Sequence, residues 1–146
     1  MIKEIAERWK TNSKSGVLCK SILTTYTIGK IISSSNLKFI TPIITILHKF
    51  LCMLSGCSIP YQAKIATTVL FPHGLYGVFI SKSARIDNNC TIYHHVTIGS
   101  SSLRVAKAPI INNDVLIGAG SKVIGEITIK SGTRIKAGDQ VFDDIL

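Results

Sequence analysis

The stretch IINNDVLIGAGSKVIGEITIKSGTRIKAGDQV, residues 110–141, carries an aliphatic side chain at every sixth position. These positions are Ile111, Ile117, Val123, Ile129, Ile135 and Val141. An α-helix requires a hydrophobic period of about 3.6 residues and a half-buried strand a period of about 2, so the pattern fits neither. A six-residue period is typical of a triangular solenoid, in which each hexad supplies one short strand and one corner. The stretch therefore predicts a mainly β protein whose aliphatic side chains stack inside as a continuous column.

The same period extends toward the N-terminus. Four further aliphatic residues keep the phase, namely Ile80, Ile86, Ile92 and Ile98, and the series opens with Ile59 and Ile65. Corner residues are expected where glycine or asparagine supplies the backbone angles of a turn, at Asn88, Asn89, Asn112, Asn113, Gly120, Gly132 and Gly138. We expect this parallel β-helix to occupy residues 56–146 as one domain.

Residues 1–55 lack the six-residue period, and their pattern predicts an N-terminal helical segment. Helices are expected at about residues 2–12, 16–34 and 42–54, the last with Pro42 in its first turn. The apolar stretch 39–54 is interrupted by Pro42, His48 and Lys49 and is shorter than the roughly 20 residues that cross a bilayer. It is expected to be a packed helix with His48 partly buried.

The composition limits the partners. The net charge is +9, from 17 Lys and Arg against 8 Asp and Glu, which admits nucleic acid, anionic membranes and phosphorylated ligands. No nucleic-acid motif is present, so we expect no nucleic-acid partner, no transmembrane segment and at most a weak peripheral membrane association. The charged start MIKEIAERWK is unlike a secretory leader and favours the cytoplasm. The four cysteines (Cys19, Cys52, Cys57, Cys90) show no metal-site spacing and are expected to be small buried side chains without metal or disulfide.

Two interruptions of the repeat indicate where the binding and catalytic residues are expected. Phe71 and Ile80 are nine residues apart, and Ile98 and Ile111 are thirteen apart, where six is expected. Loops that leave a rigid scaffold usually carry binding and catalysis. Counting hexads through the first interruption puts His73 and His94 on the same corner of consecutive coils, about 4.8 Å apart along the axis. An imidazole can take a proton from a hydroxyl at neutral pH, so His73 is a candidate general base, with His95 next to the pair.

At these residues the sequence resembles the serine acetyltransferase-like family of hexapeptide acyltransferases. The resemblance is carried by GCSIPYQAKI (56–65), FPHGLYGVFISKSARIDNNCTIYHHVTIG (71–99) and APIINNDVLIGAGSKVIGEITIKSGTRIKAG (108–138). It implies a left-handed parallel β-helix and an O-acetyltransferase that uses acetyl-CoA as acyl donor, with no metal. It also implies that His73 is the catalytic residue, which deprotonates the acceptor hydroxyl for direct attack on the thioester.

The chain departs from the family pattern at two places that concern the acceptor. Ser58 stands where the family has an aspartate that orients the histidine, so the Nδ1 atom of His73 is expected to donate to Ser58 or to a backbone carbonyl. Lys107 and Ala108 stand where serine acetyltransferases have a basic residue and a histidine that receive the amino acid carboxylate. The predicted acceptor is therefore a hydroxyl of a sugar or surface polysaccharide, with Ser58, His94, His95 and Lys107 as its binding residues.

For the donor, the resemblance implies a groove between neighbouring subunits of a homotrimer. The pantetheine arm of acetyl-CoA is expected along small residues, and its phosphates near basic ones. The predicted cofactor-binding residues are Gly99, Ser100, Ala119, Gly120, Lys122, Lys136 and Ala137, with Arg134 as a further phosphate candidate. Two alternatives stay open: a serine O-acetyltransferase of cysteine biosynthesis, and a non-catalytic trimeric β-helix scaffold.

Overall fold

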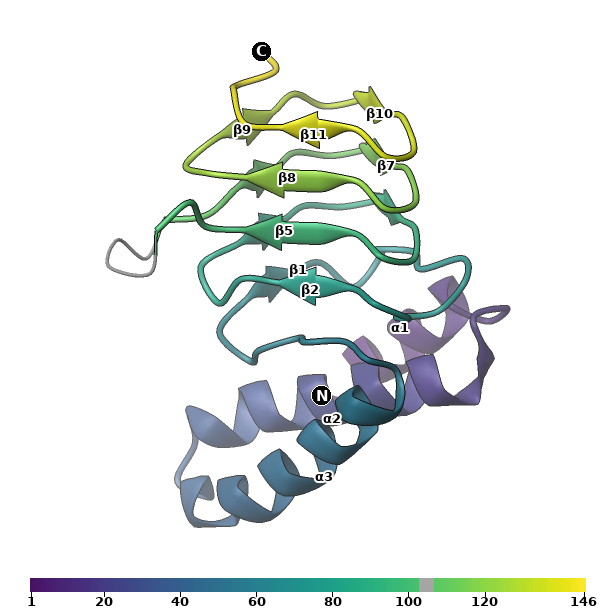
Figure 1. Ribbon diagram of the computed structural model, residues 1–146. Helices are drawn as coiled ribbons and strands as arrows, with labels where there is room; N and C mark the ends of the chain where they lie inside the picture. The colour runs from purple at the N-terminus through teal and green to yellow at the C-terminus, as the bar shows by residue number, and fades with distance from the viewer. Residues whose placement is uncertain (103–106) are drawn as a thin grey trace.

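The computed structural model describes residues 1–102 and 107–146, and it consists of an N-terminal helical part followed by a parallel β-helix (Figure 1). The helices pack at one end of the solenoid, and the C-terminus lies at the other end. A single cluster of buried hydrophobic residues runs from the helices through the coils. The predicted mainly β solenoid with a helical preface is confirmed.

The helical part follows the sequence pattern closely. Its elements are α1 (Ile2–Thr11), α2 (Gly16–Ser33), the short 3-10 helix η1 (Lys38–Ile40) and α3 (Thr41–Leu54). Pro42 lies in the first turn of α3, where its missing N–H costs no hydrogen bond. Glu4 in the first turn of α1 and Arg8 and Lys10 in its last turn complement the helix dipole. The sequence pattern did not reveal η1, which is too short to show a hydrophobic period.

The solenoid is built from short parallel strands in three sheets. The first sheet has the order β1 (Lys64–Ile65), β3 (Arg85–Ile86), β6 (Ile110–Ile111) and β9 (Thr128–Ile129). The second has the order β10 (Arg134–Ile135), β7 (Leu116–Ile117) and β4 (Thr91–Ile92). The third has the order β11 (Gln140–Val141), β8 (Lys122–Ile124), β5 (Thr97–Gly99) and β2 (Phe79–Ile80).

The strand register shows where the two interruptions of the repeat are accommodated. In the first sheet Ile65 pairs with Ile86, Ile86 with Ile111 and Ile111 with Ile129, which are 21, 25 and 18 residues apart. The regular coil has 18 residues, so the first interruption adds three residues and the second adds seven between strands that keep their pairing. As predicted, the Pro72–Gly77 stretch of the first interruption lies outside the strands; the second includes residues 103–106, which are not among the described residues.

The aliphatic column fills the solenoid interior. In each of the predicted hexads from Ile59 to Ile135 the aliphatic residue is buried, and only Val141 at the open end is half-buried. All four cysteines are buried free thiols, and Cys90 lies within this column. Stacked side chains of this kind give the coils a continuous core, which is why each coil can have such short strands.

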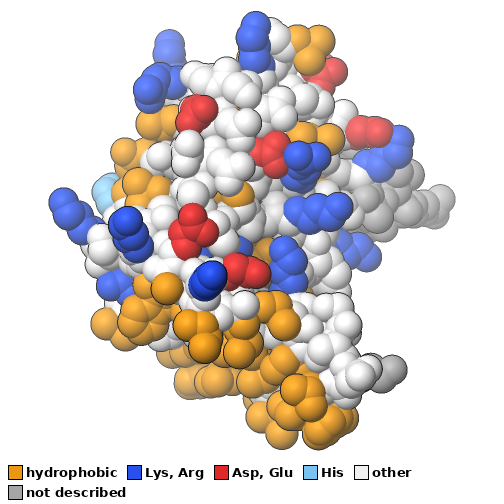
Figure 2. All heavy atoms as spheres, turned by 180° about the vertical axis from the view of Figure 1, so that it is seen from behind, with side chains coloured by type: hydrophobic (Ala, Val, Ile, Leu, Met, Phe, Trp, Pro, Cys, Tyr) orange, Lys and Arg blue, Asp and Glu red, His pale blue; other side chains and the backbone are white. Residues whose placement is uncertain are grey.

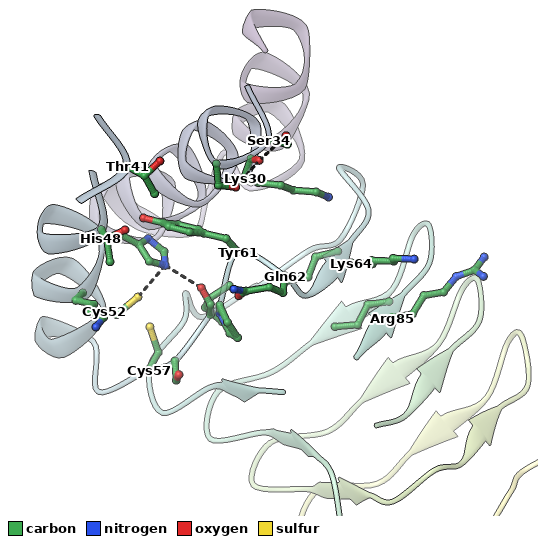
Figure 3. Close-up of a pocket in the computed structure, with 18 of the residues that line it drawn as sticks. Lys30, Ser34, Thr41, His48, Cys52, Cys57, Tyr61, Gln62, Lys64 and Arg85 are labelled. Atoms are coloured by element: carbon green, nitrogen blue, oxygen red, sulfur yellow. Dashed lines mark hydrogen bonds between the residues drawn. The ribbon is translucent and has the colours of Figure 1, made fainter. Parts of the chain in front are cut away.

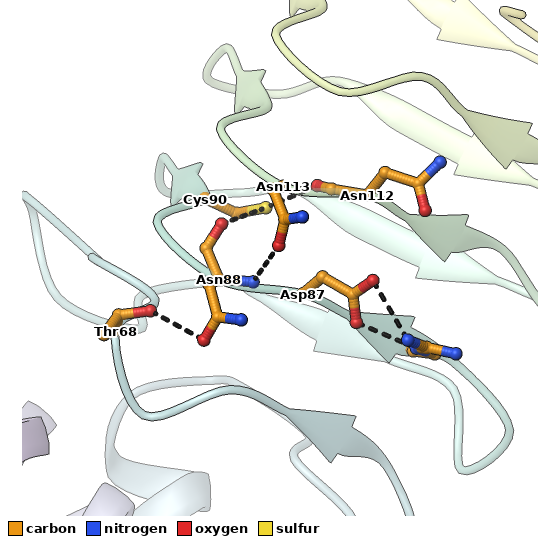
Figure 4. A network of polar contacts seen from close by, with 7 residues as sticks. Thr68, Asp87, Asn88, Cys90, Asn112 and Asn113 are labelled. Carbon is orange, nitrogen blue, oxygen red and sulfur yellow. Dashed lines mark hydrogen bonds and ion pairs between the residues drawn. The ribbon is translucent and has the colours of Figure 1, made fainter.

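One corner of the solenoid is held by a polar network between successive coils (Figure 4). The side-chain oxygen of Asn113 accepts the backbone N–H of Asn88 at 3.0 Å, and the Cys90 thiol donates to the carbonyl of Asn112 at 3.0 Å. Asn89 and Asp114 have the left-handed φ values of 57° and 61° that the turn requires. Asparagine at this corner thus serves the turn and the stacking of coils.

No helix within residues 1–102 and 107–146 combines the length and the apolar character that crossing a membrane requires.

Candidate active site

His73 lies on a corner where one turn is repeated in four successive coils. The bridge between Leu70 and Thr91 and the pairs of Leu116 with Thr91 and with Arg134 set the register. Three residues beyond each of these positions come His73, His94, Ala119 and Ala137. The residue that follows each of them has a positive φ, with values of 75° at Gly74, 58° at His95, 73° at Gly120 and 79° at Gly138. The four side chains therefore stand at equivalent positions of the same turn.

The two imidazoles on this corner contact each other. The Nδ1 atoms of His73 and His94 are 3.0 Å apart, and their rings are stacked with centroids 5.1 Å apart. The predicted sharing of one corner is confirmed. His73 is exposed, so the pair is open to a ligand from solvent.

The contact between the two Nδ1 atoms restricts the tautomers of the pair. A hydrogen bond between two ring nitrogens requires that one is protonated and the other carries a lone pair. When His73 donates from Nδ1, its Nε2 atom is left with a lone pair. An imidazole in this state can accept a proton from a hydroxyl group at Nε2.

Tyr93 is a neighbour of His73 that the sequence analysis did not single out. Its ring meets the His73 ring edge-on at a centroid distance of 5.3 Å and an interplanar angle of 89°. The register that places His94 above His73 also places Tyr93 above Pro72, so the sequence did contain a signal for this contact.

Asn12 fixes the chain immediately before His73. This fully buried side chain accepts the backbone N–H of Phe71 at 2.8 Å and donates to the carbonyl of Val69 at 3.0 Å. Just beyond, Gly74 approaches the carbonyl of Ser15 so closely that a Cβ atom would lie 3.3 Å from it. The turn between α1 and α2 therefore supports the Pro72-His73-Gly74 kink from behind, which no local sequence pattern indicated.

The predicted hydrogen bond from His73 to Ser58 or to a backbone carbonyl is wrong. In the described residues the Nδ1 atom of His73 pairs with His94, and Ser58 makes no hydrogen bond with His73. Ser58 instead forms a backbone bridge with Phe79 and lines a cavity beside the helices. His94, on the next coil, is therefore the hydrogen-bond partner of the His73 Nδ1 atom, in place of the aspartate that this chain lacks at position 58.

His95 lies beside this pair, whereas Lys107 lies elsewhere. The His95 ring is 5.4 Å from that of His94, and the backbone N–H of His95 donates to the carbonyl of Tyr76 at 2.8 Å. Gly77 makes room for it, because a Cβ there would lie 2.1 Å from the Nδ1 atom of His95. Lys107 precedes β6 on a different corner and forms a 2.5 Å ion pair with Glu126. Residues 103–106 of the second interruption lie outside the described residues.

The predicted cofactor-binding residues fall into two groups. Ala119, Gly120 and Ala137 continue the corner of His73, with Lys136 next to them. Lys122 begins β8, two residues after Gly120, and Arg134 begins β10, three residues before Ala137, so both flank this corner. Gly99 and Ser100 lie at the other end of β5, where Gly99 pairs with Ile124. The sheet that contains β5 and β8 therefore separates the two groups, by roughly 10 Å for a three-residue strand.

The corner of Ala119 and Ala137 offers unpaired backbone groups. Within the part of the chain that the structure describes, the N–H groups of both alanines donate to no other group. Neighbouring groups are paired, since Gly120 donates to the carbonyl of His94 at 3.1 Å. Gly118 allows the coils to approach here, because a Cβ atom would lie 2.5 Å from the nitrogen of Ala137. The free N–H groups could donate to an extended ligand that carries amide carbonyls, such as the pantetheine arm of acetyl-CoA.

A second polar cluster, absent from the sequence analysis, lies between α3 and the first coil (Figure 3). His48 is buried, not partly buried as predicted; its Nδ1 is 2.8 Å from Thr25 Oγ1 and its Nε2 is 2.8 Å from the carbonyl of Ile59. Burial disfavours the charged ring, but hydrogen bonds with Cys52 and the Ile59 carbonyl outweigh it and raise the pKa of His48. Hydrogen bonding from the Cys57 thiol, together with His48, lowers the pKa of the Cys52 thiol. His48 and Cys52 border a cavity of about 1120 Å³. Among the described residues no hydrogen bond joins them to His73 or His94.

Comparisons with known proteins find similarity to serine acetyltransferases in both sequence and structure. No family model matches the sequence. The chain is 32% identical over 124 residues to the serine acetyltransferase of Helicobacter pylori strain J99, covering 84% of this chain and 70% of the relative. It spans only 38–49% of the length of several other bacterial serine acetyltransferases to which it is similar.

Solved structures agree with the architecture. Neisseria gonorrhoeae serine acetyltransferase superposes with a TM-score of 0.83 at 22% identity, covering 99% of this chain and 60% of that one. Soybean serine acetyltransferase complexed with serine superposes with a TM-score of 0.74 at 30% identity, covering 85% and 50%. None of these three proteins is a polysaccharide O-acetyltransferase, so the predicted closeness to such enzymes is not supported.

Proposed function

The chain belongs to the serine acetyltransferase family, and on that premise we propose that it transfers an acetyl group from acetyl-CoA to a hydroxyl group. The observation that carries the proposal is the His73–His94 contact on an exposed corner that continues into Ala119 and Ala137. This arrangement supports a general base on the first two coils and a binding surface for an extended thioester on the next two.

His73 is the general base of the proposed reaction. With its Nδ1 proton donated to His94, its Nε2 atom accepts the proton of the acceptor hydroxyl as the oxygen attacks the carbonyl carbon of the thioester. The carbon–sulfur bond then breaks, and the CoA sulfur takes the proton from Nε2, which restores neutral His73. His94 keeps the ring orientation and accepts the Nδ1 hydrogen bond while His73 is positively charged.

The donor is expected along the corner column. The free N–H groups of Ala119 and Ala137 can donate to the pantetheine amides, and the small side chains of Ala119 and Gly120 leave room for the arm. Lys136 is exposed next to this column, and Lys122 and Arg134 are exposed on adjacent strands, where they can pair with phosphate groups. Gly99 and Ser100, at the far end of β5, remain predicted contacts for another part of the donor.

L-serine is the first candidate acceptor. The relatives reported above are serine acetyltransferases, and the soybean structure holds serine. A sugar hydroxyl is the second candidate, because Ala108 is buried and offers no charged group to an amino acid carboxylate, and Lys107 is engaged with Glu126. His95 and Ser58 stay predicted acceptor contacts.

A cyclic homotrimer completes the proposal. A single solenoid gives the His73 corner only one wall, and a neighbouring subunit would supply the second. Light scattering of the purified protein checks this, with three chains per particle as the expected result.

Release of thiol from acetyl-CoA tests the function. L-serine, simple sugars and oligosaccharides are supplied in turn as acceptor, with His73→Asn as the inactive control and Lys82→Ala as a matched surface control. Thiol release with L-serine supports the first candidate, and release with a sugar alone supports the second. No release with any acceptor, together with no binding of acetyl-CoA in calorimetry, would favour the non-catalytic scaffold.

A further inference from the structure

One face of α3 exposes a continuous row of large apolar side chains. The exposed fractions range from 47% to 71% over Ile43, Ile46, Leu47, Phe50, Met53 and Leu54. The spacing of three and four residues puts them on one side of the helix, opposite the buried His48 and Cys52. Phe39, just before the helix, is 73% exposed and extends the row. Figure 2 shows hydrophobic side chains gathered over the helical end of the molecule.

This face contributes nothing to the core of the protein. α3 already packs on α2 through its other side, and it meets the start of the first coil where His48 bonds the Ile59 carbonyl and Tyr61 donates to the Ile44 carbonyl. Contiguous exposed apolar surface of this kind marks a site of association and is not expected of an isolated soluble chain. Burying it against a partner removes six large side chains from water.

The charge around the face identifies the kind of partner. No Asp or Glu occurs between Glu7 and Asp87, whereas residues 8–86 contain ten of the 17 Lys and Arg. Lys49 lies on α3 itself, and Lys30, Lys49 and Lys64 are exposed around the neighbouring cavity. The one acidic residue of that cavity, Asp87, is paired with Arg85 at 2.8 Å. The helical segment of residues 1–55 carries eight Lys and Arg against Glu4 and Glu7, so this end of the molecule has a net positive charge.

We propose that the exposed face of α3 docks on an anionic lipid surface, with the helix lying in the plane of the interface. A helix of 14 residues is about 21 Å long, too short to cross a bilayer but suited to lie in its headgroup region. Basic residues near the surface add electrostatic attraction to anionic lipids. A second copy of the chain is the less suitable partner, because it would bring two positive ends together.

The arrangement of the fold is compatible with this mode of docking. The helices lie at one end of the solenoid, away from the C-terminal coils (Figure 1). Cyclic symmetry places equivalent surfaces of every subunit at the same level along the axis, so three copies of the α3 face could meet one membrane together. The docking does not depend on the proposed acetyl transfer.

Sedimentation with lipid vesicles tests the proposal. The full chain is mixed with vesicles of phosphatidylcholine alone and of phosphatidylcholine with phosphatidylglycerol. We expect binding to the anionic vesicles that weakens with added salt, and little binding to the neutral ones. The double variant Ile46→Glu and Phe50→Glu should bind about tenfold less, because it removes two apolar anchors and adds negative charge.

Phe142→Glu is the matched control, since this aromatic residue is 55% exposed at the opposite end of the solenoid. It should bind vesicles like the unchanged chain, and circular dichroism should show the same thermal transition for all variants. No binding to anionic vesicles, or equal binding of the double variant, would overturn the proposal. Self-association would also overturn it. In that case light scattering would show a larger particle that persists with anionic vesicles and that the double variant abolishes.

Discussion

The corner of His73 and His94 in the first two coils has the same backbone turn as the corner of Ala119 and Ala137 in the next two. All four residues precede a residue with positive φ, and all four stand in one register. Only the side chains differ. The first two coils carry two imidazoles in contact, and the next two carry two methyl groups beside free backbone N–H groups. Under the proposed function, the same repeated turn would serve proton transfer where it carries imidazoles and donor binding where it carries alanines.

Removing the first imidazole should have the largest effect. His73→Ala should lower kcat by about 10³-fold or more, because a positioned general base typically contributes 10²- to 10⁴-fold. The measurement is the initial rate of thiol release at saturating acetyl-CoA. His73 is exposed, so the thermal transition should not change, and a variant with unaltered kcat would refute its role.

Removing the second imidazole should have a smaller effect. His94→Ala leaves the Nδ1 atom of His73 without its partner at 3.0 Å, so the ring loses its fixed tautomer and kcat should fall about 10²-fold. The pH dependence of kcat should also change, which a purely structural residue would not cause. Lys82→Ala is the control, because Lys82 is exposed between β2 and β3 and has no role in the proposed site. Equal losses in the two variants would contradict the pairing of His73 with His94.

The support behind the first coil can be tested by stability. Asn12→Ala leaves the buried N–H of Phe71 and the carbonyl of Val69 without partners, which should lower the free energy of unfolding by about 2 kcal/mol. Ser13→Ala, at an exposed neighbouring position, should change it by less than about 0.5 kcal/mol. Denaturant unfolding measures both. Equal stabilities would mean that the helical turn does not hold the Pro72-His73 kink.

The alanine half of the corner should affect the donor alone. Ala137→Leu fills the space beside a free N–H group and should raise the KM for acetyl-CoA about tenfold, with kcat little changed. Ala137 is exposed, so stability should be preserved. A fall in kcat with an unchanged KM would indicate that the donor does not lie along this corner.

The sequence predicted the repeating parts well and the singular contacts poorly. The six-residue period located the strands, and counting through the interruption at Pro72 placed His73 and His94 together. The sequence analysis expected the His73 Nδ1 atom to bond Ser58 or a backbone carbonyl, and not His94, because the period gives the position of a residue along the wall but not the direction of its ring. Asn12 was not predicted because its partners lie 57 and 59 residues away in the sequence. The cluster of His48 and Cys52 was not predicted because its contact with Ile59, 11 residues away, depends on how α3 packs on the first coil.

A double-mutant cycle on His73 and His94 tests the account most directly. It compares kcat/KM for thiol release in the unchanged chain, His73→Ala, His94→Ala and the double variant. Because His94 acts through His73, we predict that the double variant is no slower than His73→Ala alone. Losses that multiply, or a His73→Ala variant with full activity, would contradict the assignment of this pair as the catalytic base.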